Sequence, residues 1–266
     1  MKPFLKWAGN KHRIFHKIKP YLLKSNRLIE PFLGSAAVFL NTSYQSYLLG
    51  DNNFDLIQLY KYLQKEGQFF IDYCRFFFKK KFNTTDEFYR LRRVFNNTKK
   101  CRQRAALLLY LNKHCFNGLA RFNQKGEFNT PFSPYKNPYF PEKEMQYFYK
   151  HANKATFIHG DFLSTLASVK QGDIVYCDPP YVGLSNTANF TQYTSQGFSR
   201  SQQLSLAKTA KYLASKGIRV IISNHDTEFT RYIYREARLI SFSVQRNISS
   251  KSVTRKKTKE ILAIFS

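Results

Sequence analysis

The stretch DIVYCDPPY (173–181) places a carboxylate at a rigid turn. Residues 174–177 have the β-branched and aromatic composition of a short buried strand. Pro179 and Pro180 cannot donate to a sheet ladder and fix φ near about −65°, so the strand must end at Asp178. Because open α/β sheets bind ligands at the carboxyl edge of their strands, we expect Asp178 to lie in a ligand site.

The tetrapeptide Asp178 to Tyr181 suits chemistry on an exocyclic amine of a nucleic-acid base. Such an amine is a poor nucleophile, because its lone pair is delocalised into the ring. If Asp178 and the carbonyl of Pro179 both accept hydrogen bonds from the amine, its nitrogen becomes pyramidal and can attack an electrophile. Tyr181 would stack on the base, which must first leave the duplex at a cost of a few kcal/mol.

A second candidate site lies near the N-terminus. Residues 27–32 resemble a strand, 33–36 a tight turn around Gly34, and 37–40 the start of a helix. A lone glycine turn of this kind is equally typical of an ordinary strand-to-helix connection. A further short strand, 47–51, ends in Asp51 about 20 residues after the glycine, where an acid can accept two hydrogen bonds from a ribose diol.

The charge balance predicts an acidic, extended partner. The 266 residues include 43 Lys and Arg against 17 Asp and Glu, a net charge of +26. No basic amphipathic helix stands out, so nucleic acid is favoured over a membrane surface. A biased base composition of the coding genome is an alternative source of part of the excess.

Neither a membrane span nor a metal site is predicted. The N-terminal residues lack the apolar core of a signal peptide, and the longest apolar run, 105–111, is too short to cross a bilayer. Four cysteines, Cys74, Cys101, Cys115 and Cys177, form no CxxC pair, so we expect reduced thiols and no metal. We therefore expect a soluble, intracellular protein.

Three regions are predicted along the chain. Residues 1–56 and 146–266 have α/β character. Residues 57–145 carry 18 Lys and Arg against 7 Asp and Glu, with helical periodicity at 87–95 and 103–111, followed by an Asn-, Gly- and Pro-rich stretch at 112–141. We expect 57–145 to be an inserted, mostly helical module with an exposed binding loop or hairpin.

Motifs spread over nearly the whole chain resemble the Dam family of DNA adenine-N6 methyltransferases, which acts on GATC. They are FLKWAGNK, EPFLGSAAVFLN, GDNNFDLI, LYLNKHCFNGLARFNQKGEFNTPF, YKNPYFP, VYCDPPY, TANFTQY, ISNHDT and ISSKSVTRKK. The resemblance implies an α/β fold: a Rossmann-like S-adenosylmethionine-dependent methyltransferase sheet with an inserted, mostly helical DNA target-recognition domain. It also implies double-stranded DNA as the partner, and a monomer of the bacterial cytoplasm or nucleoid, or of a phage-infected host.

The resemblance assigns roles residue by residue. Catalysis falls to Asp178, Pro179 and Tyr181. S-adenosylmethionine would be bound by Trp7, Lys11, Phe32, Gly34, Ser35, Asp51, Asp161, Phe162 and Asp178. DNA would be contacted by Lys6, Phe116, Asn117, Leu119, Arg121, Asn123, Pro131 and Tyr135.

Three positions depart from the family pattern. Phe116 stands where a tyrosine is usual, which keeps stacking but removes a hydroxyl contact. Ala36 replaces a glycine of the cofactor turn, which weakens cofactor binding if the position needs a positive φ. Pro134 stands where an arginine could grip guanine O6 and N7, so we predict adenine methylation in GATC with relaxed selectivity at one guanine.

Two alternative functions remain open. A catalytically inactive basic DNA-binding protein would not need an intact DPPY motif or Asp51, and both are intact. An amino-methyltransferase acting on RNA or on cytosine N4 is the other alternative. Related cytosine enzymes tend to have serine, and RNA enzymes asparagine, in place of Asp178.

Overall fold

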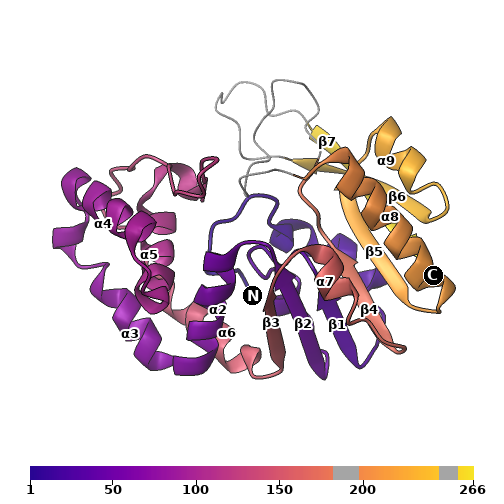
Figure 1. The fold of residues 1–266 in the computed structure, drawn as a ribbon, viewed down its shortest axis with the longest axis horizontal. Coiled ribbons are helices and arrows are strands. Elements are labelled where there is room, and N and C mark those ends of the chain that lie inside the picture. The colour runs from indigo at the N-terminus through magenta and orange to yellow at the C-terminus, as the bar shows by residue number, and fades with distance from the viewer. Residues whose placement is uncertain (182–197, 246–256) are drawn as a thin grey trace.

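A seven-stranded sheet forms the centre of the protein, in a computed structural model that describes residues 1–181, 198–245 and 257–266 (Figure 1). The strand order is β3-β2-β1-β4-β5-β7-β6, and β7 alone runs antiparallel to its neighbours β5 and β6. This mostly parallel sheet confirms the predicted Rossmann-like α/β fold. The strands are β1 (Arg27–Glu30), β2 (Ser46–Asp51), β3 (Ala155–His159), β4 (Asp173–Cys177), β5 (Arg219–His225), β6 (Arg238–Gln245) and β7 (Lys257–Phe265).

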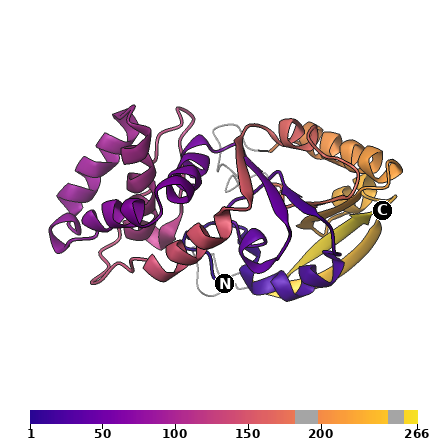
Figure 2. The same cartoon turned by 90° about the horizontal axis from the view of Figure 1, so that it is seen from below.

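Alternate residues of each strand enter two different cores. In β4, Ile174 and Tyr176 belong to one apolar cluster, whereas Val175 and Cys177 belong to the other. The period of two that defines a strand therefore builds both faces of the sheet. Figure 2 shows the N-terminal turns on one face and α7 and α8 on the other. The covering elements are η1 (Lys11–Ile14), α1 (Phe15–Ile18), η2 (Lys19–Tyr21), α7 (Phe162–Leu166), α8 (Arg200–Ser215) and α9 (Glu228–Ile233).

Two details of the first βα unit differ from the prediction. The strand predicted at 27–32 ends at Glu30, because Pro31 has no N–H to continue the ladder. The helix predicted to start near residue 37 is wrong: only a 3-10 turn forms there, η3 (Phe39–Asn41). Ala36 has a φ of +62°, outside the helical region, so a regular helix cannot begin at the glycine turn.

A helical lobe is inserted between β2 and β3, on the left in Figure 1. Helices α4 and α5 confirm the two periodic segments, and α5 is buried on all sides from Ala105 to His114. The predicted boundaries at 56/57 and 145/146 fall inside α2 and α6, so the division into domains stays a prediction. The helices are α2 (Phe54–Glu66), α3 (Gln68–Phe76), α4 (Thr85–Asn97), α5 (Cys101–His114) and α6 (Glu142–Ala152), with the 3-10 turns η4 (Lys80–Phe82) and η5 (Phe116–Gly118).

The segment after α5 folds back on itself. Isolated antiparallel bridges join Cys115 to Phe132 and Phe122 to Phe128. The tip between them is closed by Asn123, whose side-chain oxygen accepts from the backbone N–H groups of Lys125 and Glu127. The stretch predicted as a loop or hairpin is thus a two-stranded arm in its distal part, whereas its first three residues still belong to α5.

Two family-like motifs lie outside the described residues: TANFTQY (187–193) and nearly all of ISSKSVTRKK (248–257). Among the described helices, none has the length and apolar character needed to cross a membrane. All four cysteines are free thiols. No group of His, Cys, Asp or Glu side chains within residues 1–181, 198–245 and 257–266 is arranged to hold a metal ion.

Candidate active site

The Asp178 carboxylate is held at the end of β4 by two side chains from other elements. Lys11 Nζ lies 2.8 Å from Asp178 Oδ1, and Ser223 Oγ on β5 donates to the same oxygen at 3.0 Å. Lys11 is itself buried and donates to the carbonyl of Gly9 at 3.0 Å. Burial raises the pKa of Asp178 above its ordinary value, and the ion pair with Lys11 opposes that rise. The carboxylate is therefore oriented through Oδ1, and Oδ2 carries neither of these bonds.

Tyr181 lies against the same lysine. Lys11 Nζ is 4.7 Å from the centroid of the Tyr181 ring, and the ring of His225 is 4.3 Å away at an interplanar angle of 59°. The hydroxyl of Tyr181 donates to Glu260 Oε2 on β7 at 3.1 Å. The ring is thus fixed beside Asp178, and stacking on a base remains a prediction for it.

The glycine turn and Asp51 are joined directly. Gly34 has a φ of +50°, and its N–H donates to Asp51 Oδ2 at 2.9 Å. Asp51 Oδ1 accepts the N–H of Asn53 at 2.9 Å. Burial raises the pKa of Asp51, and these two hydrogen bonds act in the opposite direction. A carboxylate has about four acceptor positions, so Asp51 keeps capacity for a ribose diol.

The indole ring of Trp7 packs against the glycine turn at Gly34. A Cβ atom on Gly34 would lie 3.2 Å from Trp7 Cδ1, closer than an ordinary contact. Ser35, the next residue of the turn, is buried. The close approach of backbone and indole explains why the turn requires glycine at position 34 in addition to its positive φ.

The substitution at Ala36 falls on a strained position. Its φ of +62° is left-handed, and its side chain is fully buried. We expected Ala36 to weaken cofactor binding if its position needs a positive φ, and this φ is positive. Left-handed backbone costs a non-glycine residue about 1–2 kcal/mol, and the buried methyl group contributes about 0.8 kcal/mol in return. The strain is thus only partly offset by packing.

An aromatic cluster lies beyond the turn. The rings of Phe32 and Phe162 are stacked, with centroids 5.5 Å apart, and Phe198 meets both edge-on at 5.5 Å. Asp161 caps the N-terminus of α7 by accepting from Ser164 N at 2.8 Å. Phe32, Asp161 and Phe162 therefore lie together at the edge of the sheet that carries Asp51 and Asp178.

Three buried polar residues near Asp178 or Tyr181 were not predicted individually. They are Glu30, Ser223 and Glu260. Ser223 belongs to the ISNHDT motif at the end of a strand, so the sequence contained a signal for it. Burial raises the pKa of Glu30 well above its ordinary value, the charge of Asp178 adds to this effect, and Glu30 Oε1 has no hydrogen-bond partner among the described residues. No local pattern marks Glu30, because its neighbours come from other strands.

The residues predicted to contact DNA lie on two segments. One is the arm after α5 (115–141), and the other is the N-terminal leader, which comprises the residues before β1 (1–26). Phe116 is 53% exposed at the start of η5, and Asn117 beside it has a φ of +55°, so the backbone turns sharply under the aromatic ring. Arg121 and Pro131 are also exposed, whereas Leu119 is half-buried. Lys6 Nζ lies 5.2 Å from the centroid of the Tyr135 ring. The structure thus brings Lys6 and Tyr135 together across the junction of leader and lobe.

Two of these side chains already have partners on the arm. Arg121 Nε donates to Asn129 Oδ1 at 2.7 Å and Nη2 donates to the carbonyl of Asn129 at 3.5 Å, so a ligand would have to bind Nη1 or replace the longer of these two bonds. Asn123 uses its amide within the turn, because Nδ2 donates to Glu127 Oε2 at 2.7 Å while Oδ1 accepts two backbone N–H groups. A DNA contact by Asn123 would therefore have to share or replace these bonds.

Comparisons with known proteins identify the family of the chain. The profile of the D12 class N6 adenine-specific DNA methyltransferases matches residues 7–248. The chain belongs to this family. It is 46% identical to a DNA adenine methylase of Serratia marcescens over 99% of this chain and 98% of the relative. The corresponding identities are 44% for a DNA adenine methylase of Escherichia coli K12 (99% and 95%) and 43% for one of Vibrio cholerae (99% and 96%).

This adenine-specific DNA methyltransferase thus acts on DNA with a methyl donor. The DPPY motif at the end of β4 agrees with that activity, and the membership confirms the enzyme class predicted from the sequence. The assignments of individual cofactor and DNA contacts stay predictions.

Proposed function

We propose that the enzyme transfers a methyl group from S-adenosylmethionine to N6 of an adenine that has left the duplex, within GATC or a close relative. The observation that carries this proposal is the polarised Asp178 carboxylate, fixed by Lys11 and Ser223 at the same sheet edge as the Gly34–Asp51 turn. One site therefore combines an acceptor for an amine with acceptors for a nucleoside.

The chain's own groups would activate the adenine amine. Asp178 Oδ2 and the carbonyl of Pro179 would each accept one N–H of N6, which directs the nitrogen lone pair away from the ring. After transfer the amine carries an extra proton, and Asp178 would accept or relay that proton. Lys11 keeps the carboxylate charged although it is partly buried, since its charge opposes the rise in pKa that burial causes.

The residues of the turn fit S-adenosylmethionine. Asp51 would accept from the ribose hydroxyls, Gly34 and Trp7 would approach the ligand closely, and Phe32 and Phe162 would lie beside its adenine. When bound, this cofactor supplies an electrophilic methyl group on a sulfonium. We also propose that the enzyme is a monomer of the bacterial cytoplasm or of a phage-infected host cell.

Specificity would come from the arm after α5. Phe116 would enter the base stack, and Arg121 would present its exposed guanidinium to a guanine. Pro134 is exposed but has no donor, so one guanine of GATC would be read less strictly.

The test is incubation with S-adenosylmethionine carrying a labelled methyl group and with matched duplex DNA, single-stranded DNA or RNA. We expect label in N6-methyladenine of duplex DNA, mainly at GATC. Label in cytosine or RNA would favour the other amino-methyltransferases. Binding of duplex without transfer would favour the inactive DNA-binding protein.

A further inference from the structure

Lys6 belongs to the leader but is held by the helical lobe. Its N–H donates to Asn112 Oδ1 at 3.0 Å, and its carbonyl accepts from Asn112 Nδ2 at 2.7 Å, although the two residues are 106 positions apart in sequence. The same Nδ2 donates to the carbonyl of Gly118 at 2.9 Å. Asn112 is fully buried on α5. One amide therefore joins the leader, α5 and η5.

The position of the Lys6 side chain is also restricted, because it packs against Gly118. Gly118 has a φ of +67°, and a Cβ atom on it would lie 2.2 Å from Lys6 Cδ and 2.8 Å from Lys6 Cβ. The alkyl stem of Lys6 thus lies directly on the Gly118 backbone. Its ammonium is directed toward the ring of Tyr135, 5.2 Å away, while the residue as a whole stays exposed.

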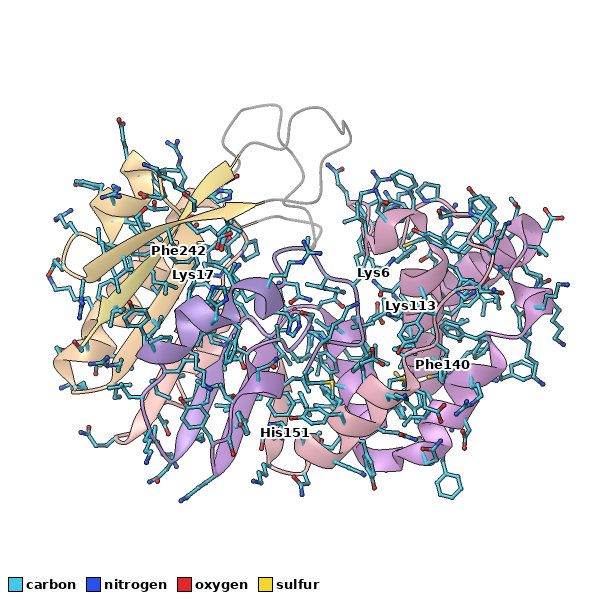
Figure 3. All side chains as sticks on the ribbon, turned by 180° about the vertical axis from the view of Figure 1, so that it is seen from behind. Lys6, Lys17, Lys113, Phe140, His151 and Phe242 are labelled. Atoms are coloured by element: carbon cyan, nitrogen blue, oxygen red, sulfur yellow. The ribbon has the colours of Figure 1, made fainter. Side chains whose placement is uncertain are left out.

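Positive charge is concentrated at this junction. Figure 3 shows Lys6 and Lys113 near each other where the leader meets the lobe. Burial lowers the pKa of Lys113 to about 8, and the charge of Lys6 contributes to that shift. An anionic ligand would relieve the repulsion between the two ammonium groups, and DNA is the anionic substrate of the enzyme.

We propose that Asn112 is a positioning residue for DNA binding, which acts by fixing the backbone of Lys6 so that its ammonium is presented to the duplex from a defined place. The inference rests on the proposed role of Lys6 in DNA binding. A long lysine side chain loses rotamer freedom when it binds, and a fixed backbone with a guided stem reduces that loss. An apolar residue at 112 could not replace the amide, because the Lys6 N–H, the Lys6 carbonyl and the Gly118 carbonyl would all lose this partner.

A double-mutant cycle tests the proposal. Binding of a short GATC duplex is measured by fluorescence anisotropy at fixed salt for the wild type, Lys6→Met, Asn112→Ala and the double variant. In the wild-type background we expect Lys6→Met to weaken binding by about 5-fold or more. In the Asn112→Ala background the same change should cost at least about 3-fold less, because coupled residues are not additive. Additive losses would overturn the proposal, since a merely structural role of Asn112 lowers binding independently of Lys6.

Two glycine variants keep the proposal testable if Asn112→Ala does not fold. Gly118→Ala should displace the Lys6 stem and weaken duplex binding. Gly172→Ala is the matched control: its φ is +84°, so it imposes comparable backbone strain, but nothing lies within 4 Å of the added Cβ. Equal duplex binding by the two variants, at equal folded fractions, would overturn the proposal.

The outcome is separable from that of the proposed function. If the wild type transfers no methyl group from S-adenosylmethionine to GATC duplexes, the proposed donor or recognition sequence is wrong. The cycle measures binding alone, so it still decides the role of Asn112.

Discussion

Lys11 Nζ and Asp178 Oδ1 are 2.8 Å apart, and this ion pair joins the leader to the end of β4. The sequence predicted Lys11 as a cofactor residue and Asp178 as a catalytic residue. Their contact means that removal of either side chain changes the charge balance around the other. A substitution at Lys11 therefore also reports on the ionisation of Asp178.

Asp178→Ala should abolish methyl transfer while duplex binding persists. The adenine amine loses an acceptor, and a preorganised electrostatic group of this kind is worth on the order of 10²-fold or more in kcat. Binding depends on basic side chains that remain in place. The measurements are single-turnover methylation and anisotropy with the same duplex. Asp72→Ala on the exposed face of α3 is the control, and turnover near that of the control would exclude Asp178 as the catalytic acceptor.

In Lys11→Met, the acid limb of the pH profile of kcat should move to higher pH. Catalysis needs Asp178 as a carboxylate, so activity is lost as pH falls through its pKa, which burial has raised above the ordinary value. Lys11 lowers that pKa, and its removal lets the carboxyl protonate at higher pH. The pH profile is measured at saturating methyl donor. The control is Lys17→Met. Lys17 also lies in the leader, but its ammonium lies over the ring of Phe242, so this variant should keep the acid limb of the wild type (Figure 3). An unshifted acid limb in Lys11→Met would show that the ion pair does not set the ionisation of Asp178.

Local patterns predicted the parts of the site but not their assembly. Strand composition and the proline pair located Asp178, because both effects act within a few residues. The helix after Gly34 was wrong because Ala36 takes a left-handed φ, which alanine rarely does. Ser223 and Glu30 meet Asp178 only because β5 and β1 both flank β4, and this strand order is set by the packing of the whole sheet rather than by any local pattern.

Asp51→Ala should raise KM for S-adenosylmethionine far more than KM for DNA. The expected loss is about 10-fold or more, since hydrogen bonds to a charged group contribute about 1.5–3 kcal/mol each. Asp51→Asn keeps one acceptor oxygen for the Gly34 N–H and should fall between the wild type and Asp51→Ala. Calorimetry with the cofactor checks both variants. Unchanged cofactor affinity in Asp51→Ala would mean that Asp51 stabilises the glycine turn but does not bind the cofactor.

Glu30→Gln should change how stability depends on pH. Burial raises the pKa of Glu30, so the folded state favours the protonated acid and loses stability as pH rises from the unfolded pKa, about 4.3, toward the folded value. Glutamine cannot ionise. The free energy of unfolding of Glu30→Gln minus that of the wild type should therefore increase with pH above about 4.3. Urea unfolding at several pH values checks this, and a difference independent of pH would mean that Glu30 ionises normally in the folded state.

Pro134→Arg should sharpen the recognition sequence. Pro134 is exposed beside Tyr135, whose N–H donates to the carbonyl of Ser133 at 2.8 Å and whose ring lies next to Lys6. An arginine here could bond guanine O6 and N7 together, which is worth roughly 1–3 kcal/mol against a wrong base, or about 5- to 150-fold. Lys136 and Lys125 are exposed on the same arm, but a lysine is a flexible point charge and discriminates less.

The test of Pro134→Arg is methylation of a library of single-base GATC variants, followed by sequencing of the methylated sites. We expect the wild type to accept substitutions at one guanine and Pro134→Arg to reject them, with the other positions unchanged. Pro134→Lys separates geometry from charge: it adds the same charge without the planar fork, so it should improve total activity more than selectivity. Selectivity in the wild type as sharp as in Pro134→Arg would show that another side chain already reads that guanine. A dominant motif unrelated to GATC would show instead that the specificity of the family does not extend to this enzyme.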